Sequence, residues 1–229
     1  MSHDPPSPPR YAGVLFDLDG TVVDTLELIL SSYRYTMIRH LGQSPPDEAW
    51  RRTMGTPLRE QLRAFARSPE EADAMMATYL EHNQAHHDRL VRSFPGMRES
   101  LLALKEVGYR MGIVTSKLRA QALRELRTCG LTDLFESLVC ADDVERPKPH
   151  PEPVLQAARQ LGLPGQRLLL VGDSIYDLRS GRAAGLDTAA ALWGPFDRAD
   201  LTPGRPTHWL PDLDALVRLL SPRREERDG

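Results

Sequence analysis

Four segments that lie far apart in the sequence carry side chains that could do chemistry together. Three of them follow a short apolar run, and the fourth is a proline-flanked loop ahead of a predicted helix. The side chains are carboxylates, hydroxyls and one ammonium group: Asp17, Asp19, Thr115, Ser116, Lys148, Asp173 and Asp177. Together they would combine groups that bind cations with groups that bind anions.

The carboxylates predict a magnesium site. Acids gathered at one place repel one another, which raises their pKa values unless a cation neutralises them. Hard oxygen ligands without histidine or cysteine favour Mg²⁺. We therefore expect a magnesium ion among Asp17, Asp19, Asp173 and Asp177.

The other groups predict a phosphate as the ligand. Lys148 and the hydroxyls of Thr115 and Ser116 could bind its oxygens, and Gly20 would let backbone N–H groups approach closely. One of the two acids after the first apolar run could attack phosphorus to form an aspartyl-phosphate. The other could protonate the leaving oxygen and later activate water.

Alternating strands and helices are expected to position these groups. Open parallel sheets bind ligands outside the carboxyl ends of their strands, and the polar residues follow strand ends. Such alternation predicts an α/β fold with a parallel sheet covered on both faces. The predicted strands are residues 14–16, 110–116, 136–143, 167–173 and 187–193, and the predicted helices are residues 97–108, 119–130, 151–162 and 174–185.

A helical insertion interrupts this alternation after the first strand. Apolar spacing predicts a helix after Thr25 that stops at Gly42, and Ser68, Pro69 and Glu71 form a capping-box pattern for another. We therefore expect a discontinuous core domain with a helical cap and flexible tails. The core would comprise residues 11–24 and 95–221, the cap residues 25–94, and the tails residues 1–10 and 222–229.

Composition excludes several other classes of protein. The 229 residues, 41% of them hydrophobic, are enough for a core. There are 29 Lys and Arg against 32 Asp and Glu and no long basic stretch, so no nucleic-acid partner is expected. No segment resembles a signal peptide or a membrane span, so we expect a cytoplasmic protein without a membrane partner. Nothing indicates an oligomeric state.

Taken together, these segments resemble the motifs of the haloacid dehalogenase superfamily. "FDLDGTVVDT", "GIVTSK", Lys148 in "RPKPHPEP" and "LLVGDSIYDLRSGRAAG" occur in the family's order and cover most of the chain. The resemblance implies a Rossmann-like core with a helical cap.

The resemblance also implies roles for individual residues. Asp17 would be the nucleophile and Asp19 the general acid and base, and Thr115 and Lys148 would hold the phosphoryl group. Mg²⁺ would be bound by the Asp17 carboxylate, the Asp19 backbone carbonyl and Asp173. Asp177 would be a further ligand or would orient bound water.

Within the superfamily, the sequence is most similar to the bacterial pyrophosphatases and phosphoglycolate phosphatase-like proteins. "ELI" after the first motif, the Asn–His–His pattern and "DDVERPKPHPEPV" carry this similarity, and Ser174 departs from it where Asn is expected. Pyrophosphate is the first expected substrate, with phosphoglycolate or another small phosphomonoester second. A phosphosugar mutase stays open. Asp19 disfavours a dehalogenase, and the lysine-free insertion disfavours phosphonate cleavage.

Residues of the insertion are candidates for substrate contacts. An arginine-rich turn could present positive charge to an anion, and ordinary surface arginines are an equal alternative. His82 and His86 are four residues apart, but solvated helix positions are favoured over a metal site. The candidate residues are Arg52, Gly55, Arg59, Asn83, His86 and His87.

Two non-enzymatic alternatives fit less well. Response-regulator receivers also gather acids, a threonine and a lysine at a sheet edge, but they are about half as long and carry the phosphorylated Asp after a later strand. A silent binding protein would be expected to lack one of Asp17, Asp19, Lys148 or Asp173, and all four are present.

Overall fold

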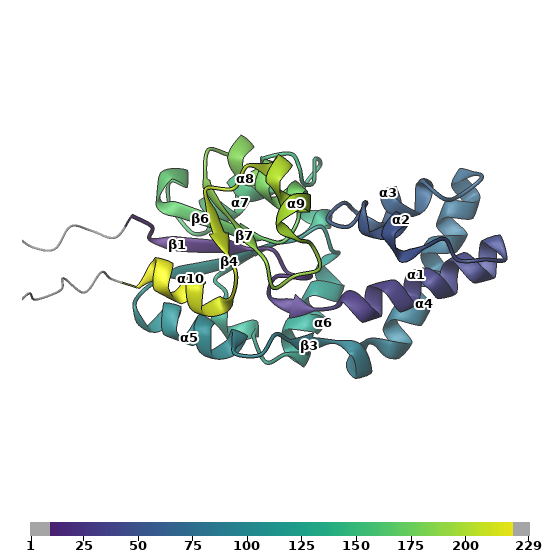
Figure 1. Ribbon diagram of the computed structural model, residues 1–229, viewed down its shortest axis with the longest axis horizontal. Helices are drawn as coiled ribbons and strands as arrows, with labels where there is room; N and C mark the ends of the chain where they lie inside the picture. Colours follow the sequence, from purple (N-terminus) through teal and green to yellow (C-terminus); the bar gives the residue numbers. More distant parts are fainter. Residues whose placement is uncertain (1–9, 222–229) are drawn as a thin grey trace, which may run out of the picture.

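The computed structural model describes residues 10–221. Apart from Arg10, the predicted tails lie outside the described residues. The chain builds a six-stranded parallel sheet with helices on both faces and a helical module at one end (Figure 1). The predicted α/β class is confirmed.

The strand order, β5-β4-β1-β6-β7-β8, puts the first strand at the centre of the sheet. From β1 the chain adds strands outward on one side and then crosses to the other, so the order reverses between β1 and β6. Such a reversal opens a crevice at the carboxyl ends of the two strands. The strands are β1 (Gly13–Phe16), β4 (Arg110–Val114), β5 (Ser137–Val139), β6 (Leu168–Gly172), β7 (Asp187–Ala191) and β8 (His208–Leu210).

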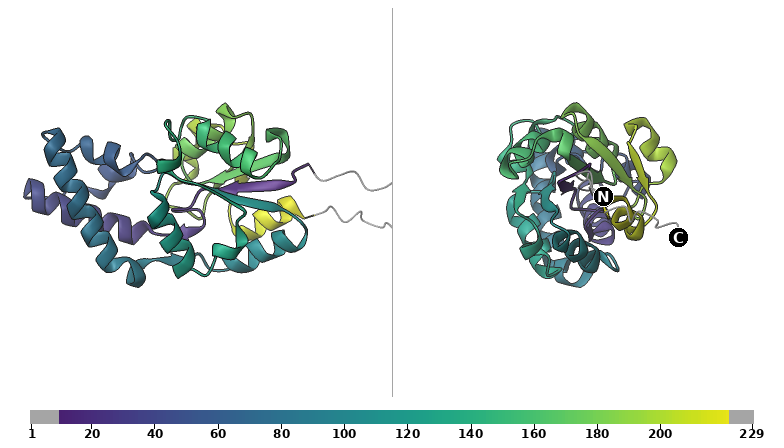
Figure 2. Two further views of the ribbon diagram at one scale, coloured as in Figure 1. Left: turned by 180° about the vertical axis from the view of Figure 1, so that it is seen from behind. Right: turned by 90° about the vertical axis from the view of Figure 1, so that its left-hand side faces the viewer.

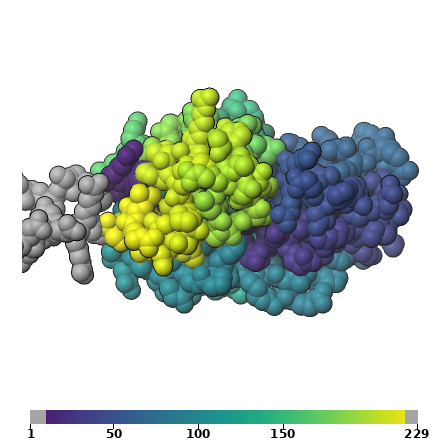
Figure 3. Space-filling view, in the orientation of Figure 1, coloured from purple at the N-terminus to yellow at the C-terminus, as the bar shows by residue number. Residues whose placement is uncertain are grey.

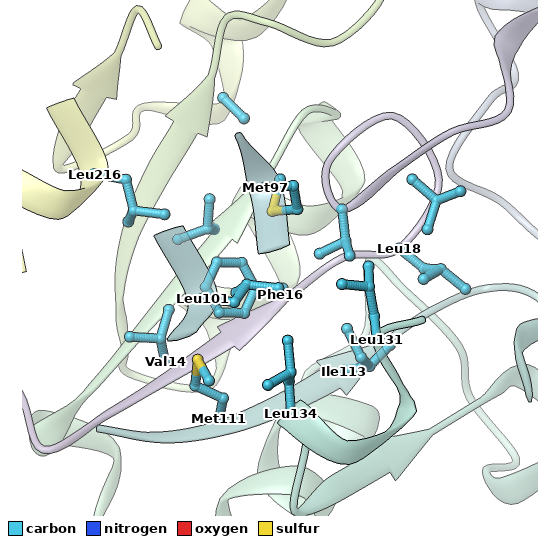
Figure 4. Close-up of a cluster of buried hydrophobic side chains, with 14 of the residues drawn as sticks. Val14, Phe16, Leu18, Met97, Leu101, Met111, Ile113, Leu131, Leu134 and Leu216 are labelled. Carbon is cyan, nitrogen blue, oxygen red and sulfur yellow. The ribbon is translucent and has the colours of Figure 1, made fainter. Parts of the chain in front are cut away.

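Both faces of the sheet are buried because successive strand residues point to opposite sides. Val14 and Phe16 pack under α5 (Met97–Glu106), α6 (Arg119–Thr128) and α10 (Leu213–Leu220) (Figure 4). Leu15 faces the other layer, which contains α7 (Glu152–Gln160), and α8 (Ile175–Ala183) packs on the same side. A strand buried on both faces reads as a continuous apolar run, which is why β1 and β6 were recognisable.

The helical module joins the sheet domain through a two-stranded antiparallel ribbon of β2 (Val23–Asp24) and β3 (Arg92–Ser93). It has its own apolar core, in which Tyr33, Trp50 and Met75 are fully buried. The module forms one end of the molecule, opposite the end where β1 begins and α10 lies (Figure 1 and Figure 2). Its helices are α1 (Leu26–Leu41), α2 (Asp47–Arg51), α3 (Leu58–Arg63) and α4 (Pro69–Leu90).

The helix ends follow the predicted signals with one correction. Gly42 ends α1 with φ 77°, as expected for a glycine stop, and the Ser68 side chain accepts a hydrogen bond from the Glu71 backbone N–H. The reciprocal half of the capping box is absent. The Glu71 carboxylate instead accepts hydrogen bonds from the backbone and side chain of Arg67, because the neighbouring guanidinium offers a charged donor.

Several short or terminal elements were not predicted. The ribbon strands β2 and β3 have two residues each, too short for any periodicity to appear. The edge strand β8 and the helix α10 follow a loop with prolines, and β8 has only three residues. Short helices complete the fold: α9 (Arg198–Leu201) and the 3₁₀ turns Thr132–Leu134, Ala141–Asp143, Gly165–Arg167 and Thr202–Gly204.

Candidate active site

Two carboxylates stand immediately past the ends of the central strands. Asp17 continues β1, and its backbone N–H donates to the carbonyl of Val171 at 2.9 Å, while Asp173 follows β6 directly. Asp17 is 5% exposed and Asp173 is 3% exposed. The reversal of strand order therefore brings together acids that are 156 positions apart, as their residue numbers show.

Lys148 joins this pair from the loop before α7. Its Nζ donates to Asp17 Oδ1 at 2.7 Å, to Asp177 Oδ1 at 2.5 Å and to the carbonyl oxygen of Val114 at 3.2 Å. An ammonium has three donor hydrogens, and these contacts use all of them. The lysine is 3% exposed, so its position is fixed by the carboxylates and the end of β4.

Asp177 is held by the first turn of α8. Ser174 caps this helix, and its backbone N–H and hydroxyl donate to Asp177 Oδ2 at 3.0 and 2.5 Å. Both oxygens of Asp177 thus already accept hydrogen bonds from protein donors. The serine that departs from the expected asparagine performs the capping that asparagine would also provide.

The loop after β1 fits closely around Asp173. Thr21 donates from its hydroxyl to Asp173 Oδ1 at 2.8 Å, and Gly20 has φ 78°. A Cβ at residue 20 would lie 2.4 Å from Asp173 Oδ2. The glycine is therefore required both by the backbone conformation and by the space that the carboxylate occupies.

The electrostatics of this cluster favour a bound cation. Carboxylate oxygens of Asp17, Asp173 and Asp177 lie within 4.8 Å of one another, and among the described residues Lys148 is the cation that contacts two of them, Asp17 and Asp177. Burial and the Asp177 charge raise the pKa of Asp17 to about 7, against the lowering effect of Lys148. Burial and the Asp17 charge likewise raise the pKa of Asp173 well above its ordinary value.

The donor set fits a divalent metal ion. Three buried carboxylates face one ammonium, so negative charge is left uncompensated at the site. Within residues 10–221, no hydrogen-bond donor reaches Asp17 Oδ2 or Asp173 Oδ2. All available ligand atoms are oxygens, which suits a hard cation.

Asp19 lies beside this cluster with different partners. Its Oδ1 accepts from the Thr25 hydroxyl at 2.5 Å and from Lys117 Nζ at 2.7 Å. Lys117 also contacts Glu125 Oε1 on α6. These two residues were not among the predicted site residues, although Lys117 ends the segment "GIVTSK". Nothing in the sequence marks Glu125, because it reads as an ordinary polar helix position.

The phosphate-binding candidates lie at the end of β4. The backbone N–H of Thr115 donates to the carbonyl of Val139 at 2.9 Å, and its hydroxyl accepts from the Lys117 N–H at 3.2 Å. The Ser116 hydroxyl donates to the Gly55 carbonyl of the helical module at 2.7 Å. Ser116 therefore contacts both the sheet domain and the module.

A cavity of about 510 Å³ lies between the sheet edge and the helical module. Its sheet side carries the charged groups just described, and its module side is largely apolar. The module side includes Ile29, Trp50, Met54, Leu58, Met76 and Leu80. In the space-filling view the module meets the residues near position 200 along this boundary (Figure 3). The ring of Phe196, from that segment, packs into the module's apolar core.

The cap candidates divide into two groups. Gly55, Arg59 and Asn83 line the cavity. Gly55 has φ 98°, and a Cβ there would lie 2.8 Å from the Ser174 hydroxyl, so the turn comes very close to the sheet domain. Arg59 is also paired with Asp73 at 2.5 Å.

The other three cap candidates do not line this cavity. Arg52 pairs with Glu48 and borders a separate hollow of about 210 Å³. His86 stacks on His82 with ring centroids 4.1 Å apart, an arrangement that does not aim both rings at one ion. His87 is buried one turn past Asn83, where its Nδ1 contacts Asp88 Oδ1 at 2.8 Å.

Comparison with known proteins places this geometry in context. The family model of haloacid dehalogenase-like hydrolases matches residues 14–191. Pyrophosphatase PpaX of Halalkalibacterium halodurans is 39% identical over 207 residues, 89% of this chain and 95% of the relative.

Two solved structures share the fold. A haloacid dehalogenase-like family hydrolase from Streptococcus pneumoniae has a TM-score of 0.80 at 24% identity, covering 93% of this chain and 99% of its own. A protein from Haemophilus somnus, described as a predicted phosphoglycolate phosphatase, has a TM-score of 0.84 at 21% identity, with the same coverage. Among the described residues, no helix has the length and apolar content that a membrane crossing needs.

Proposed function

The chain belongs to the haloacid dehalogenase-like hydrolases, as an enzyme of the phosphatase type, and on that premise we propose that it transfers a phosphoryl group to Asp17 and then to water. The observation that carries this proposal is the position of Asp17. It stands at the end of the central strand with Oδ1 held by Lys148 and with no protein donor on Oδ2 among residues 10–221. A buried carboxylate oxygen directed away from its partners can act as a nucleophile.

The proposed reaction has two steps, transfer of the phosphoryl group to Asp17 and its hydrolysis by water. An oxygen of Asp17 attacks phosphorus, the bond to the leaving oxygen breaks, and Asp19 gives that oxygen a proton. Water then attacks the phosphorus of the aspartyl-phosphate and gives a proton to Asp19, which releases phosphate and restores both acids. Lys148, by exchanging one of its three present contacts for a phosphoryl oxygen, and the Thr115 hydroxyl would hold the transferred group, and Ser116 is the further hydroxyl candidate.

We propose Mg²⁺ as the divalent ion, held by Asp17, Asp173 and the backbone carbonyl of Asp19. Bound there, it would neutralise the acids and the negative charge of the phosphoryl group. Asp177 would orient this site, because both of its oxygens already accept hydrogen bonds from Lys148 and Ser174. Thr21 and Gly20 shape the position of Asp173.

We propose that residues 25–94 form a cap domain that moves relative to the core, residues 11–24 and 95–221. The contacts between them at the cavity include hydrogen bonds from Ser116 to the Gly55 carbonyl and from Arg51 to the Pro195 carbonyl at 3.3 Å, and Phe196 packs against the apolar core of the cap. Closure would exclude water during attack on phosphorus, and opening would admit substrate.

We propose pyrophosphate as the first substrate, since relatives 35–39% identical over most of the chain carry the name pyrophosphatase. A small phosphomonoester such as 2-phosphoglycolate is the second candidate. The apolar wall of the cavity favours a phosphomonoester whose organic leaving group carries apolar surface, which pyrophosphate lacks and 2-phosphoglycolate has only as one CH2 group.

The decisive experiment replaces the proposed nucleophile. Asp17→Asn should abolish phosphate release with Mg²⁺ from pyrophosphate, 2-phosphoglycolate, sugar phosphates and nucleotides alike. Acid quenching of the wild type during turnover should leave phosphate on the peptide that contains Asp17. The exposed Asp214→Asn is a matched control and should retain full activity. Turnover by Asp17→Asn would show that the nucleophile is another group.

A further inference from the structure

A buried ion triad connects helix α6 to the proposed acid and base. Lys117 Nζ lies between Asp19 Oδ1, at 2.7 Å, and Glu125 Oε1. The side chain of Glu125 is 1% exposed and that of Lys117 is 12% exposed. Glu125 does not line the cavity, whereas Lys117 and Asp19 do.

Packing alone does not account for Glu125. A buried carboxylate is costly, and an apolar side chain of similar size could fill the same space without that cost. Its Oε2 is buried without a hydrogen-bond partner, and burial together with the Asp19 charge raises the pKa of Glu125 to about 8. A helix position with these features has a role beyond filling the core.

The role follows from the flexibility of lysine. The flexible side chain of a lysine would allow its ammonium group to move towards any nearby anion, including a substrate in the cavity. Glu125 accepts a second hydrogen bond from the Lys117 Nζ that contacts Asp19, so the ammonium stays in one position. From there it fixes Asp19 Oδ1 together with the Thr25 hydroxyl, which donates to the same oxygen at 2.5 Å.

This arrangement distinguishes the two oxygens of Asp19. Oδ1 accepts from two donors, while no donor among the described residues reaches Oδ2. We propose that Glu125 is a positioning residue which, through Lys117, holds Asp19 so that Oδ2 exchanges the proton with the leaving oxygen and with water. The inference rests on the proposed phosphohydrolase function and deepens it.

The test uses the dependence of the rate on the leaving group. A proton donor matters for a poor leaving group and hardly at all for a good one, and kcat/KM reports only the transfer of phosphorus to Asp17. Suitable probes are substituted phenyl phosphates with phenols of graded acidity and the alkyl phosphate 2-phosphoglycolate. A merely structural change would lower kcat/KM equally for all of them.

We expect Glu125→Met to lower kcat/KM by about tenfold or more for the alkyl phosphate and by less than about twofold for p-nitrophenyl phosphate. Glu125→Gln should fall between this variant and the wild type, because its amide oxygen still accepts from Lys117. The exposed Glu106→Met, on α5, should match the wild type with every substrate. If Glu125→Met does not fold, the same selective loss in Glu125→Gln carries the test.

The outcomes separate the two proposals. An equal loss with all leaving groups, or no loss, would overturn the positioning role while leaving the phosphohydrolase function intact. A wild-type protein that cleaves none of these phosphates and no pyrophosphate in Mg²⁺ would overturn the proposed function, and the positioning role would fall with it.

Discussion

Asp17 and Asp19 show how two acids one residue apart acquire different proposed roles. Asp17 continues a buried strand and faces Lys148, whereas Asp19 lies past the turn and faces Lys117 and Thr25. Each acid therefore has its own ammonium, and the two ammonium groups come from separate loops. The two aspartates are the same residue type, so their different surroundings must determine which one is the proposed nucleophile and which one the proposed acid and base.

Gly20 lies directly after Asp19 and against Asp173, one of the proposed metal ligands. Its φ of 78° turns the chain after Asp19, and its missing side chain leaves space for Asp173. Gly42 provides a matched comparison, since its φ is 77° but no atom lies within 4 Å of the position that an alanine Cβ would take there.

We expect Gly42→Ala to lose about 1 kcal/mol of stability, because it places an alanine in the left-handed region, and Gly20→Ala to lose more, because its Cβ would also overlap the Asp173 carboxylate. Only Gly20→Ala should also lose activity, on the order of 100-fold, since its methyl group displaces Asp173 from its proposed position. Thermal unfolding and phosphate release measure the two effects. Equal activity in both variants would contradict the proposed role of Asp173.

At the scale of elements, the first turn of α8 both starts a helix and shapes the site. Ser174 accepts from the Asp177 N–H, and its own hydroxyl and N–H bind the Asp177 carboxylate. The same box that stabilises the helix therefore fixes a residue that contacts Lys148. Ser68 at the start of α4 caps a helix far from these acids.

Ser174→Ala and Ser68→Ala should each cost about 1 kcal/mol of stability, because each removes an N-cap acceptor. Ser174→Ala should in addition weaken Mg²⁺ binding and lower kcat, since Asp177 loses a donor at 2.5 Å. Ser174→Asn should retain both properties. Chemical denaturation and Mg²⁺ titration of activity provide the measurements. A Ser174→Ala variant that loses stability but keeps its Mg²⁺ affinity and kcat would contradict the proposed link between the helix cap and the site.

At the scale of the whole molecule, the site makes the metal-free protein depend on pH in an unusual direction. A carboxyl group with a raised pKa in the folded state binds its proton more tightly than in the unfolded chain. Its contribution to stability is complete below the unfolded value and is lost as the pH rises through the folded value. For Asp17 this window runs from its ordinary value of 3.8 to about 7.

Three histidines act in the opposite direction. Burial lowers the pKa values of His82, His87 and His208, so these residues add stability as the pH rises through their ordinary range. The contribution of Asp17 to the pH dependence of stability must therefore be measured by comparing the wild type with an Asp17 variant, since both contain the same histidines.

In EDTA, Asp17→Asn should gain stability relative to the wild type as the pH rises from about 4 to about 7, by up to about 1.4 kcal/mol per pH unit. Asparagine carries no charge to bury, whereas the wild-type carboxyl must ionise. Excess Mg²⁺ should reduce this gap by stabilising the ionised wild type. Denaturation curves across this range provide the measurement, and a gap that is constant with pH would show that the Asp17 pKa is not raised.

The sequence by itself determined the α/β architecture and most of the proposed site. Buried strands leave continuous apolar runs, helix ends leave capping residues, and the polar candidates follow strand ends, so local patterns identified β1, β4 and β6 and the polar residues after them. Gly20 and Lys148 were also recognisable because their neighbours in the chain define their setting.

Only the tertiary structure decided which groups share a contact. Glu125 and Lys117 are eight residues apart, and a helix surface gives no sign that the acid turns inward to the site. Arg52, His86 and His87 resemble Arg59 and Asn83 as polar residues of a helical insertion, yet they lie away from the cavity. The direction of a side chain depends on how its helix packs against the sheet domain, and that packing is a property of distant contacts, not of local sequence.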